Sequence, residues 1–292
     1  MRLFMMRAGR PSARERYSKP RRRDTEIYNH RLPNARAPYP LKQIVTLSGD
    51  IGGGKSSVAR ILSASLGYPV ISAGAMQREI ATSMGLTTLQ LNEQSLRDRS
   101  IDDRIDAYTT ELGETRDHII VDSRLAWHFI PAAFKVFLSV DPLVGAERVF
   151  AASRSEEEHR SLDEAVANNR TRTQLETTRF RALYGIELRD YRNYDLIVDT
   201  SYVAPEVVAA TIAQAFAART DGRPHARLWM CPQRLSALPD AAGEDDAERD
   251  SAPLQLRAVD GQFQIVSGRG QIASALSRQV PLLPASLPSD PR

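Results

Sequence analysis

One glycine-rich run in the chain has the residue types and spacing for phosphate chemistry. The pattern G-x-x-x-x-G-K-[ST] is matched at every fixed position by Gly49-Asp50-Ile51-Gly52-Gly53-Gly54-Lys55-Ser56. In such a loop the glycines let successive backbone N–H groups point at phosphate oxygens, and the start of the next helix adds its positive end. Lys55 is placed to bridge the β- and γ-phosphates of ATP, and the Ser56 hydroxyl to hold Mg²⁺. We expect the stretch from Gly49 to Ser57 to bind ATP.

The surroundings of this run decide between a phosphate loop and a chance match in a glycine-rich turn. The apolar run Gln43–Leu47 directly before it is typical of a buried parallel strand, and a helix is expected over 55–66 directly after it. The loop alone identifies only a user of nucleoside triphosphates, because GTPases, ATP-driven machines and small kinases share it. The sequence contains no N-K-x-D element for reading guanine, and its core is short for an oligomeric motor, which favours a small kinase.

Residues that could hold a phosphate acceptor follow two later strands. The second predicted strand ends in Ser72-Ala73-Gly74, and Arg78 lies on the helix that opens there. The third ends in Asp122-Ser123-Arg124. Arg78 and Arg124 could fork onto one acceptor phosphate, and Asp122 could hold a magnesium-bound water. Taken singly, each arginine is more readily interpreted as a surface residue, but the paired placement at two strand ends favours the binding interpretation.

A predicted helix after Arg154 adds more arginines. Arg172, Glu176 and Arg179 are four and then three residues apart and share one helix face. Arginines on a closing lid stabilise the charge that develops during phosphoryl transfer. The same spacing also fits a salt-bridged face in solvent, and the spacing alone leaves both interpretations open.

The elements around these residues alternate between strands and helices, which predicts an α/β fold with a five-stranded parallel sheet covered by helices on both faces. Strands are expected at 43–47, 69–72, 118–121, 134–139 and 195–199. Helices are expected at 55–66, 76–106 with breaks near Gly85 and Ser100, 142–154, 161–184 and 204–219.

Four regions are predicted along the 292 residues. Residues 1–40 carry eleven Arg or Lys residues against three acidic ones and have no apolar period, which indicates a basic disordered tail. This tail is interpreted as a solvated extension, with a nucleic-acid or membrane contact as the alternative. The kinase domain is expected at 41–219, a linker at 220–252, and a small appendage at 253–288.

Composition indicates the cellular compartment in which the protein is expected. The net charge is +3, and the single cysteine, Cys231, can form neither an internal disulfide nor a metal site alone. The longest apolar stretch, 207–218, is too short to span a bilayer, and no signal peptide is recognisable. These features predict a cytoplasmic protein without a membrane segment, and they leave its oligomeric state open.

Between about Ile44 and Phe216 the sequence resembles the cytidylate kinase family, especially its archaeal-type, short-lid branch. Beyond the phosphate loop, the resemblance rests on Ile71-Ser72-Ala73-Gly74 with Arg78, Asp122-Ser123-Arg124-Leu125-Ala126, Arg172-x-x-x-Glu176-x-x-Arg179-Phe180, Tyr184-Gly185-Ile186-Glu187, and Tyr194-Asp195-Leu196-Ile197-Val198-Asp199-Thr200-Ser201.

The resemblance implies a nucleoside monophosphate kinase fold that moves the γ-phosphate of ATP, with Mg²⁺, onto CMP or dCMP. It implies that Arg78, Arg124 and Arg179 meet the acceptor phosphate, with Ser72 and Gly74 beside it. Lys55, Arg172 and Arg179 would act on the transferred group, and Ser56 with Asp122 on the metal. No covalent intermediate and no strong general base are implied.

Three positions depart from the family pattern. Bacterial relatives have a serine where Ala73 stands and an acid where Leu125 stands, and the family's usual glycine is Ser123 here. The first two help to read cytosine, so the base preference of the acceptor is left open.

The C-terminal region resembles a ParB/sulfiredoxin-like module over 253–276, and residues 228–238 could supply the first strand and turn of such a module. In that family a G-x-H-R element serves a phosphate or nucleotide site, and Gly270 and Gln271 stand in the place of its histidine and arginine. A degenerate regulatory or dimerising unit is therefore expected, with a simple packing hairpin as the alternative.

Two alternatives to a CMP kinase follow from the sequence. One is a P-loop kinase for another small phosphate acceptor. The other is a nucleotide-sensing regulatory protein that uses residues 1–40 and its C-terminal region near nucleic acid.

Overall fold

The computed structural model describes residues 42–86, 99–152, 161–241, 252–259 and 262–287. The chain falls into two units, residues 1–36 and 37–292, and all of the described residues belong to the second. The predicted basic tail at 1–40 and the acidic cluster of the predicted linker at 244–250 lie outside the described residues.

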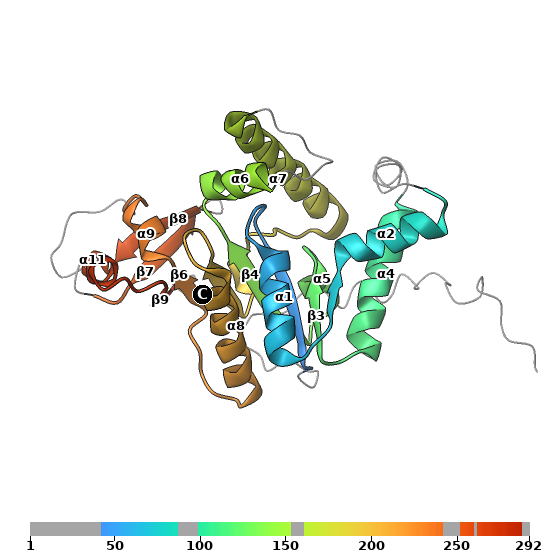
Figure 1. Ribbon diagram of the computed structural model, residues 1–292, viewed down its shortest axis with the longest axis horizontal. Coiled ribbons are helices and arrows are strands. Elements are labelled where there is room, and N and C mark those ends of the chain that lie inside the picture. Colours follow the sequence, from blue (N-terminus) through green and yellow to red (C-terminus); the bar gives the residue numbers. More distant parts are fainter. Residues whose placement is uncertain (1–41, 87–98, 153–160, 242–251, 260–261, 288–292) are drawn as a thin grey trace, which may run out of the picture. The chain divides into compact units, whose positions relative to one another are not determined.

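A seven-stranded sheet forms the centre of the described unit (Figure 1). Its strands lie side by side in the order β2 (Val70–Ser72), β3 (Ile119–Asp122), β1 (Ile44–Gly49), β4 (Phe134–Ser139), β5 (Leu196–Asp199), β6 (Leu228–Met230) and β9 (Leu283–Ala285). Strands β2 to β6 in this order are parallel, and β9 pairs antiparallel with β6. The five predicted parallel strands are confirmed, and the sheet continues beyond them by two.

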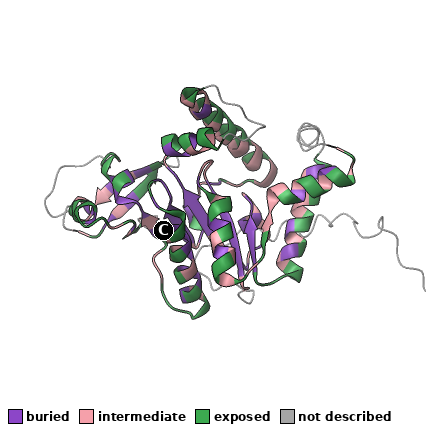
Figure 2. Cartoon of the chain, viewed as in Figure 1, coloured by how far each residue is buried: buried purple, intermediate pink, exposed green. Residues whose placement is uncertain are grey.

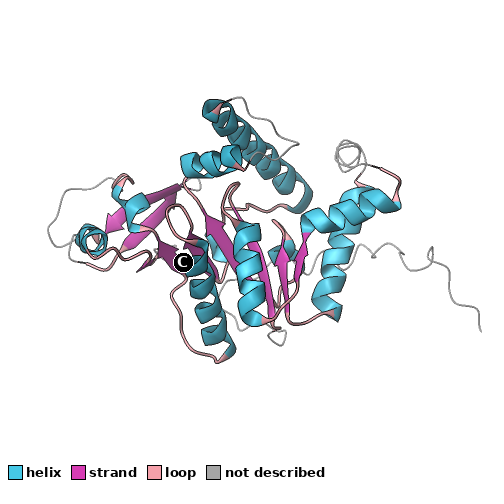
Figure 3. Ribbon diagram, in the orientation of Figure 1, coloured by secondary structure: helices cyan, strands magenta, loops and turns pink. Residues whose placement is uncertain are grey.

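Helices connect and cover these strands (Figure 3). They are α1 (Lys55–Leu66), α2 (Ala73–Ser83), α4 (Ser100–Thr115), α5 (Ala126–Phe129), α6 (Pro142–Ala151), α7 (Leu162–Tyr184), α8 (Pro205–Thr220), α9 (Pro232–Ser236) and α11 (Arg269–Ser277), with a 3₁₀ turn, η2, at Tyr191–Asn193. The predicted breaks near Gly85 and Ser100 agree with α2 ending at Ser83 and α4 beginning at Ser100. The stretch between them, 87–98, lies outside the described residues.

Neighbouring residues of a strand point to opposite faces of a sheet, and nearly all residues of β3, β1, β4 and β5 are buried (Figure 2), so both faces of the sheet are covered at these strands. On one face, alternate residues of β1, β4 and β5 pack with α1 and α8, which lie side by side. On the other face, Phe137 and Ile197 pack with Trp127 of α5 and with residues around η2. Burial on both faces explains why these strands read as continuous apolar runs in the sequence.

The region after α8 differs from the prediction of a linker followed by an appendage. Within the expected linker, Leu228–Met230 forms β6, which pairs with β5, and Pro232–Ser236 forms α9. The composition of this region is rich in Pro and Gly, but Leu228 and Met230 are fully buried, and burial in a sheet outweighs local propensity. We call residues 228–287, as far as they are described, the C-terminal segment.

The C-terminal segment shares its hydrophobic core with the central sheet. A hairpin of β7 (Gln255–Val259) and β8 (Gln262–Ser267) forms a separate two-stranded sheet. Leu256 and Phe263 of this hairpin belong to one buried cluster with Phe137, Tyr191 and Tyr194. The Phe263 and Tyr191 rings stack with centroids 5.1 Å apart. This core continuity differs from a separable appendage, and the ParB/sulfiredoxin-like ancestry of the segment stays a prediction.

None of the helices within the described ranges combines the length and the apolar character needed to cross a membrane.

The shared core predicts that the segment and the sheet unfold together. Replacing fully buried Leu256 by alanine leaves a cavity and should cost about 2–5 kcal/mol of unfolding free energy. The matched control is Leu276→Ala, at a side chain of the same segment that is 42% exposed, which should change stability by less than about 0.5 kcal/mol. Urea unfolding followed by near- and far-UV circular dichroism measures both variants. Two separate transitions in the Leu256→Ala variant, with the first belonging to the segment, would contradict a common core.

Candidate functional site

The glycine-rich loop joins β1 to α1 at the carboxyl edge of the sheet. Gly52 and Gly54 both have a φ of 76°, a left-handed conformation that favours glycine. A Cβ added to Gly52 would stand 2.2 Å from the carbonyl oxygen of Gly145 in α6, whereas a Cβ at Gly54 would meet nothing within 4 Å. The loop therefore packs backbone against backbone with α6 at Gly52 and is open at Gly54.

Asp50, the second residue of the loop, connects it to two other parts of the core. Its backbone N–H donates to the carbonyl of Leu138 at 2.9 Å, and its Oδ2 accepts from the N–H of Val140 at 3.1 Å. Its Oδ1 accepts from Arg189 Nε at 3.1 Å and Nη2 at 2.9 Å. The Asp50 carboxylate is thus held by β4 and by Arg189, which follows the end of α7.

The peptide group between Gly52 and Gly53 is engaged at both ends. The N–H of Gly53 donates to the carbonyl of Asp50 at 3.1 Å, and the carbonyl of Gly52 accepts from Arg148 Nη1 at 3.3 Å. Arg148 lies on α6. The next N–H groups along the chain are those of the first turn of α1, which begins at Lys55 and has no earlier turn to supply acceptors. This arrangement aims backbone donors at the space above the loop, as an anion site requires.

Lys55 lies partly buried at the start of α1. Desolvation, with a smaller effect of the positive charge of Arg124, lowers the pKa of its ammonium group to about 8. The carboxylates of Asp122, Glu176 and Asp50 act in the opposite direction. An ammonium group with this pKa is still mostly protonated at pH 7. A phosphate oxygen beside it would supply a negative charge that compensates for the hydration lost on burial.

Ser56, at the end of the loop, and Asp122, at the end of β3, bring two side-chain oxygens together. Ser56 Oγ donates to Asp122 Oδ2 at 2.9 Å. Hydroxyl and carboxylate oxygens suit Mg²⁺, which usually takes only one or two protein ligands beside phosphates and water. Within the described part of the chain, no three His, Cys, Asp or Glu side chains gather as a metal site. The pair therefore fits a metal that is shared with a phosphate rather than one caged by protein.

Arg124 connects the third strand to the long helix α7. Its Nη1 donates to the carbonyl of Gly49 at 3.2 Å and lies 3.0 Å from Glu176 Oε2. Arg172 Nε pairs with the other oxygen of the same carboxylate at 3.2 Å. The predicted helix face therefore includes an i,i+4 pair, but Glu176 also reaches across to the loop. A purely solvent-exposed face does not describe this geometry.

Arg179 pairs with Asp102 of α4, and Tyr184 donates a hydrogen bond from its hydroxyl to Asp106 Oδ2 at 2.7 Å. Burial raises the pKa of Asp106 to about 6, helped by the nearby charges of Asp102 and Asp103. Only Ala165 is fully buried within α7. The helix packs on α6, and its Tyr184 ring also contacts Phe129 of α5. Polar contacts join it to Arg124 through Glu176 and to α4 through Arg179 and Tyr184.

The residues after β2 form a third group. The Ser72 hydroxyl accepts a hydrogen bond from the N–H of Ala75 at 3.1 Å and so caps α2. The Arg78 guanidinium lies over Gly74, with Nη1 3.5 Å from where a Cβ at residue 74 would stand. Arg78 is exposed, and no ion pair joins it to another residue of the described ranges.

The structure therefore brings some of the predicted residues together and leaves others apart. Lys55, Ser56, Asp122 and Arg124 gather at the loop, with Arg172 joined through Glu176. Ser72 lies beside this group, because it is opposite Asp122 in the pairing of β2 with β3. The contacts of Arg179 lead to α4, and the Arg78 guanidinium lies over Gly74 on α2. Their assignment to ATP, metal and acceptor stays a prediction.

Two residues with clear contacts to the loop were not predicted. Arg148 binds the Gly52 carbonyl, and Arg189 binds the Asp50 carboxylate. The sequence offered a weak signal for Arg148, because the helix that begins at Pro142 must start beside the loop. Arg189 gave no signal, since its partner is 139 residues away in the chain.

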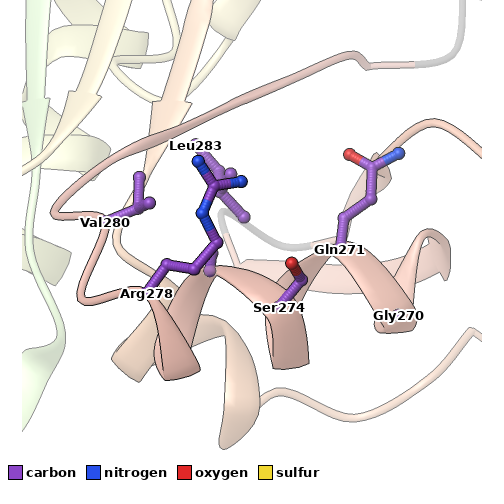
Figure 4. A pocket seen from close by; sticks show the side chains of 7 residues that line it. Gly270, Gln271, Ser274, Arg278, Val280 and Leu283 are labelled. Carbon is purple, nitrogen blue, oxygen red and sulfur yellow. The ribbon is translucent and has the colours of Figure 1, made fainter.

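A separate hollow of about 340 Å³ lies on the C-terminal segment (Figure 4). It is lined by α11 and the chain after it, including Gln271, Ser274, Arg278 and Leu283. None of the predicted site residues lines it, so it is distinct from the site at the phosphate loop.

The fold and the loop define a P-loop kinase. Residues 44–202 match the cytidylate kinase-like family, and the chain belongs to this family. The match runs from β1, through the loop and α7, to the end of β5. Membership in a kinase family does not favour the alternative of a nucleotide-sensing regulatory protein.

Curated relatives agree with this assignment. The chain is 35% identical over 174 residues to a cytidylate kinase of Natronomonas pharaonis, covering 59% of this chain and 88% of the relative. A cytidylate kinase of Ignicoccus hospitalis is 34% identical, with 58% and 96% covered. One of Sulfolobus acidocaldarius is 36% identical, with 58% and 91% covered.

The close approach of Gly52 to α6 gives a matched pair of variants. Gly52→Ala and Gly54→Ala both place a side chain at a φ of 76°, which costs about 1–2 kcal/mol. Gly52→Ala must also displace the Gly145 backbone, so it should lose at least about 1 kcal/mol more unfolding free energy than Gly54→Ala. Urea denaturation without nucleotide measures the difference. Equal losses would mean that the loop does not pack on α6 as described.

The raised pKa of Asp106 predicts a pH dependence. In the folded protein this carboxyl holds its proton up to about pH 6, but in the unfolded chain only up to about pH 4. Its contribution to stability is therefore full below about pH 4 and is lost as the pH rises through 6. Asp106→Asn should remove a decline of up to about 3 kcal/mol between pH 4 and 7.

Urea midpoints across this pH range measure the effect. Tyr184→Phe is the companion variant: it removes the hydrogen bond that lowers the pKa of Asp106, so the decline should move to higher pH. Parallel pH curves for wild type and Asp106→Asn would show that the carboxyl titrates normally.

Proposed function

We propose that the protein transfers the γ-phosphoryl group of ATP to a nucleoside monophosphate, with CMP or dCMP as the preferred acceptor. The observation that carries the proposal is the cluster of Lys55, Asp122, Arg124 and Glu176 beside the loop, inside a chain of the cytidylate kinase-like family. The acceptor comes from the names of the curated relatives.

The ATP phosphates would lie on the backbone N–H groups of the loop and of the first turn of α1. Lys55 would lie against the β- and γ-phosphates, where its desolvated charge gains a counter-ion. Ser56 and Asp122 would hold Mg²⁺, which neutralises phosphate charge when bound. Arg148 binds the Gly52 carbonyl and Arg189 binds the Asp50 carboxylate, so the loop keeps its donors oriented before the substrate arrives. Such preorganisation is the main requirement of phosphoryl transfer.

The acceptor phosphate would meet guanidinium groups. Arg124 is already aimed at the loop by Glu176 and by the carbonyl of Gly49. Arg179 and Arg172 come from α7, a helix that packs on α6 and fully buries only Ala165, and α7 would act as a lid. Arg78 is the exposed cation after β2 that would complete the acceptor side. The acceptor oxygen attacks in line and needs no strong base from the protein.

The compartment we propose is the cytoplasm, where ATP and nucleoside monophosphates occur together. In support, the single cysteine of the sequence, Cys231, is a buried free thiol. A contact of residues 1–40 with nucleic acid lies outside the described residues and stays a prediction.

An acceptor screen tests the proposed reaction. Purified protein with ATP, Mg²⁺ and one of CMP, dCMP, UMP, AMP or GMP should release ADP fastest with CMP or dCMP. Lys55→Met should lower the rate by about 10³-fold or more, because it removes a positioned charge from the transferring group. Its melting temperature should not fall, since methionine fills the same space without a desolvated charge. ADP release only with a different acceptor class, or an active Lys55→Met variant, would contradict the proposal.

A further inference from the structure

A buried arginine connects the C-terminal segment to the end of the kinase sheet. Arg234 of α9 lies outside residues 44–202, the part of the chain that matches the kinase family. Its side chain is 8% exposed, and that of its partner Asp199, at the carboxyl end of β5, is fully buried. Arg234 Nη1 donates to Asp199 Oδ1 at 3.0 Å and to Ser139 Oγ, at the end of β4, at 2.9 Å. One guanidinium nitrogen therefore holds two neighbouring strand ends together.

Asp199 collects hydrogen bonds from both sides of this junction. From the C-terminal segment, the N–H of Cys231 donates to Oδ2 at 3.2 Å. From the kinase side, the N–H and the hydroxyl of Ser201 donate to Oδ1 at 3.1 and 2.6 Å. The charge of Arg234 thus fixes the carboxylate that in turn fixes the backbone at 200–201.

The backbone at 200–201 is the anchor of Arg148. Arg148 Nη2 donates to the carbonyls of Thr200 at 2.6 Å and Ser201 at 2.8 Å. The other terminal nitrogen, Nη1, donates to the carbonyl of Gly52 in the phosphate loop at 3.3 Å. A continuous series of hydrogen bonds therefore runs from Arg234 through Asp199, residues 200–201 and Arg148 to the loop.

A second contact runs alongside the first. The Arg234 guanidinium carbon lies 5.8 Å from the centre of the Phe263 ring, and that ring stacks on Tyr191. Tyr191 is two residues from Arg189, which holds the Asp50 carboxylate of the loop. Both partners that hold the loop, Arg148 and Arg189, are therefore close to groups that contact Arg234.

The ion pair of Arg234 and Asp199 should add little to the free energy of unfolding, and its main effect is to orient the Asp199 carboxylate. Burying two charges removes their hydration, and an ion pair recovers only part of that loss. Arg234 Nε is buried without a hydrogen-bond partner in the structure, which leaves the desolvation incompletely compensated. A pair of well-packed apolar side chains would stabilise this junction equally well, but it would not orient a carboxylate toward Ser201.

We propose that Arg234 is a positioning residue for the phosphate-binding loop, through which the C-terminal segment sets the affinity of the enzyme for ATP. The inference rests on the proposed function in one respect only, that the loop binds ATP. It assigns to the C-terminal segment a part in nucleotide binding without any contact between the segment and the nucleotide.

The experiment compares Arg234→Gln, Arg234→Lys and the control Arg257→Gln, an exposed arginine of the same segment. Isothermal titration gives the Kd of Mg²⁺ with a non-hydrolysable ATP analogue, and steady-state kinetics gives KM for each substrate. Arg234→Gln should raise the Kd and the KM for ATP about tenfold while KM for the acceptor changes less than about twofold. Arg234→Lys should recover most of the affinity, and Arg257→Gln should match wild type. All assays run at least 15 °C below the melting temperature of each variant, so that loss of folded protein does not enter.

Several results would overturn the inference. One is an unchanged Kd for the ATP analogue in Arg234→Gln. Another is an equal rise of KM for ATP and KM for the acceptor, because general damage to the fold would raise both. If Arg234→Gln does not fold, Arg234→Lys is combined with Arg148→Lys. If Arg234 and Arg148 act through the same series of hydrogen bonds, the double variant should raise the Kd for the analogue by less than the product of the two single-variant effects. A Kd increase equal to that product would show that the two residues act independently and would refute the inference.

The proposed function and this inference fail in different ways. Wild-type protein that binds the analogue but phosphorylates no monophosphate contradicts the proposed reaction and leaves the positioning role measurable by titration. Active wild-type protein with an Arg234→Gln variant of normal ATP affinity contradicts only the positioning role.

Discussion

The rest of the structure depends on the need to hold a loop of bare backbone open toward one side. A phosphate cradle binds its ligand with backbone N–H groups, and its glycines have no side chains that could fix its conformation. In this protein, contacts with neighbouring elements fix the conformation of the loop. Gly52 packs on the backbone of α6, its carbonyl is bound by Arg148, and Asp50 is held by β4 and Arg189. The loop is therefore as rigid as the elements around it.

Charge is balanced around this cradle by residues from many parts of the chain. Lys55, Arg124 and Arg189 contribute positive charge, and Asp50, Asp122 and Glu176 oppose it. Arg124 is paired with Glu176 and Arg189 with Asp50, so both guanidinium groups are oriented before a phosphate arrives. The long helix α7 takes part through ionic contacts and buries only Ala165 completely. A helix attached in this way can move without opening the apolar core, which suits an element that must admit and release nucleotides.

Much of the core could be predicted because its signals are local. Helix α1 and strand β4 have the predicted bounds, since a glycine-rich motif and a continuous apolar run mark them. A strand at the start of 228–238 was expected only as part of the C-terminal module. Its pairing with β5 was not predicted, because three residues carry no period and their burial depends on a strand far away in sequence. The same reason explains the pairing of Arg179 with Asp102 and of Arg189 with Asp50. Residue type shows that an arginine can bind an anion, but the partner is fixed only by the folded topology.

The last strand of the sheet has a consequence beyond the active site. A parallel sheet that ended at β5 would expose a row of unpaired amides, which is a template for association with another chain. Here β6 and the antiparallel β9 continue the sheet, and β9 is only three residues long with Pro284 at its centre. Proline offers no amide hydrogen, and the carbonyl of Ser286, just past the strand, is already bound by the N–H of Leu256. The C-terminal segment thereby closes one margin of the sheet against edge-to-edge aggregation.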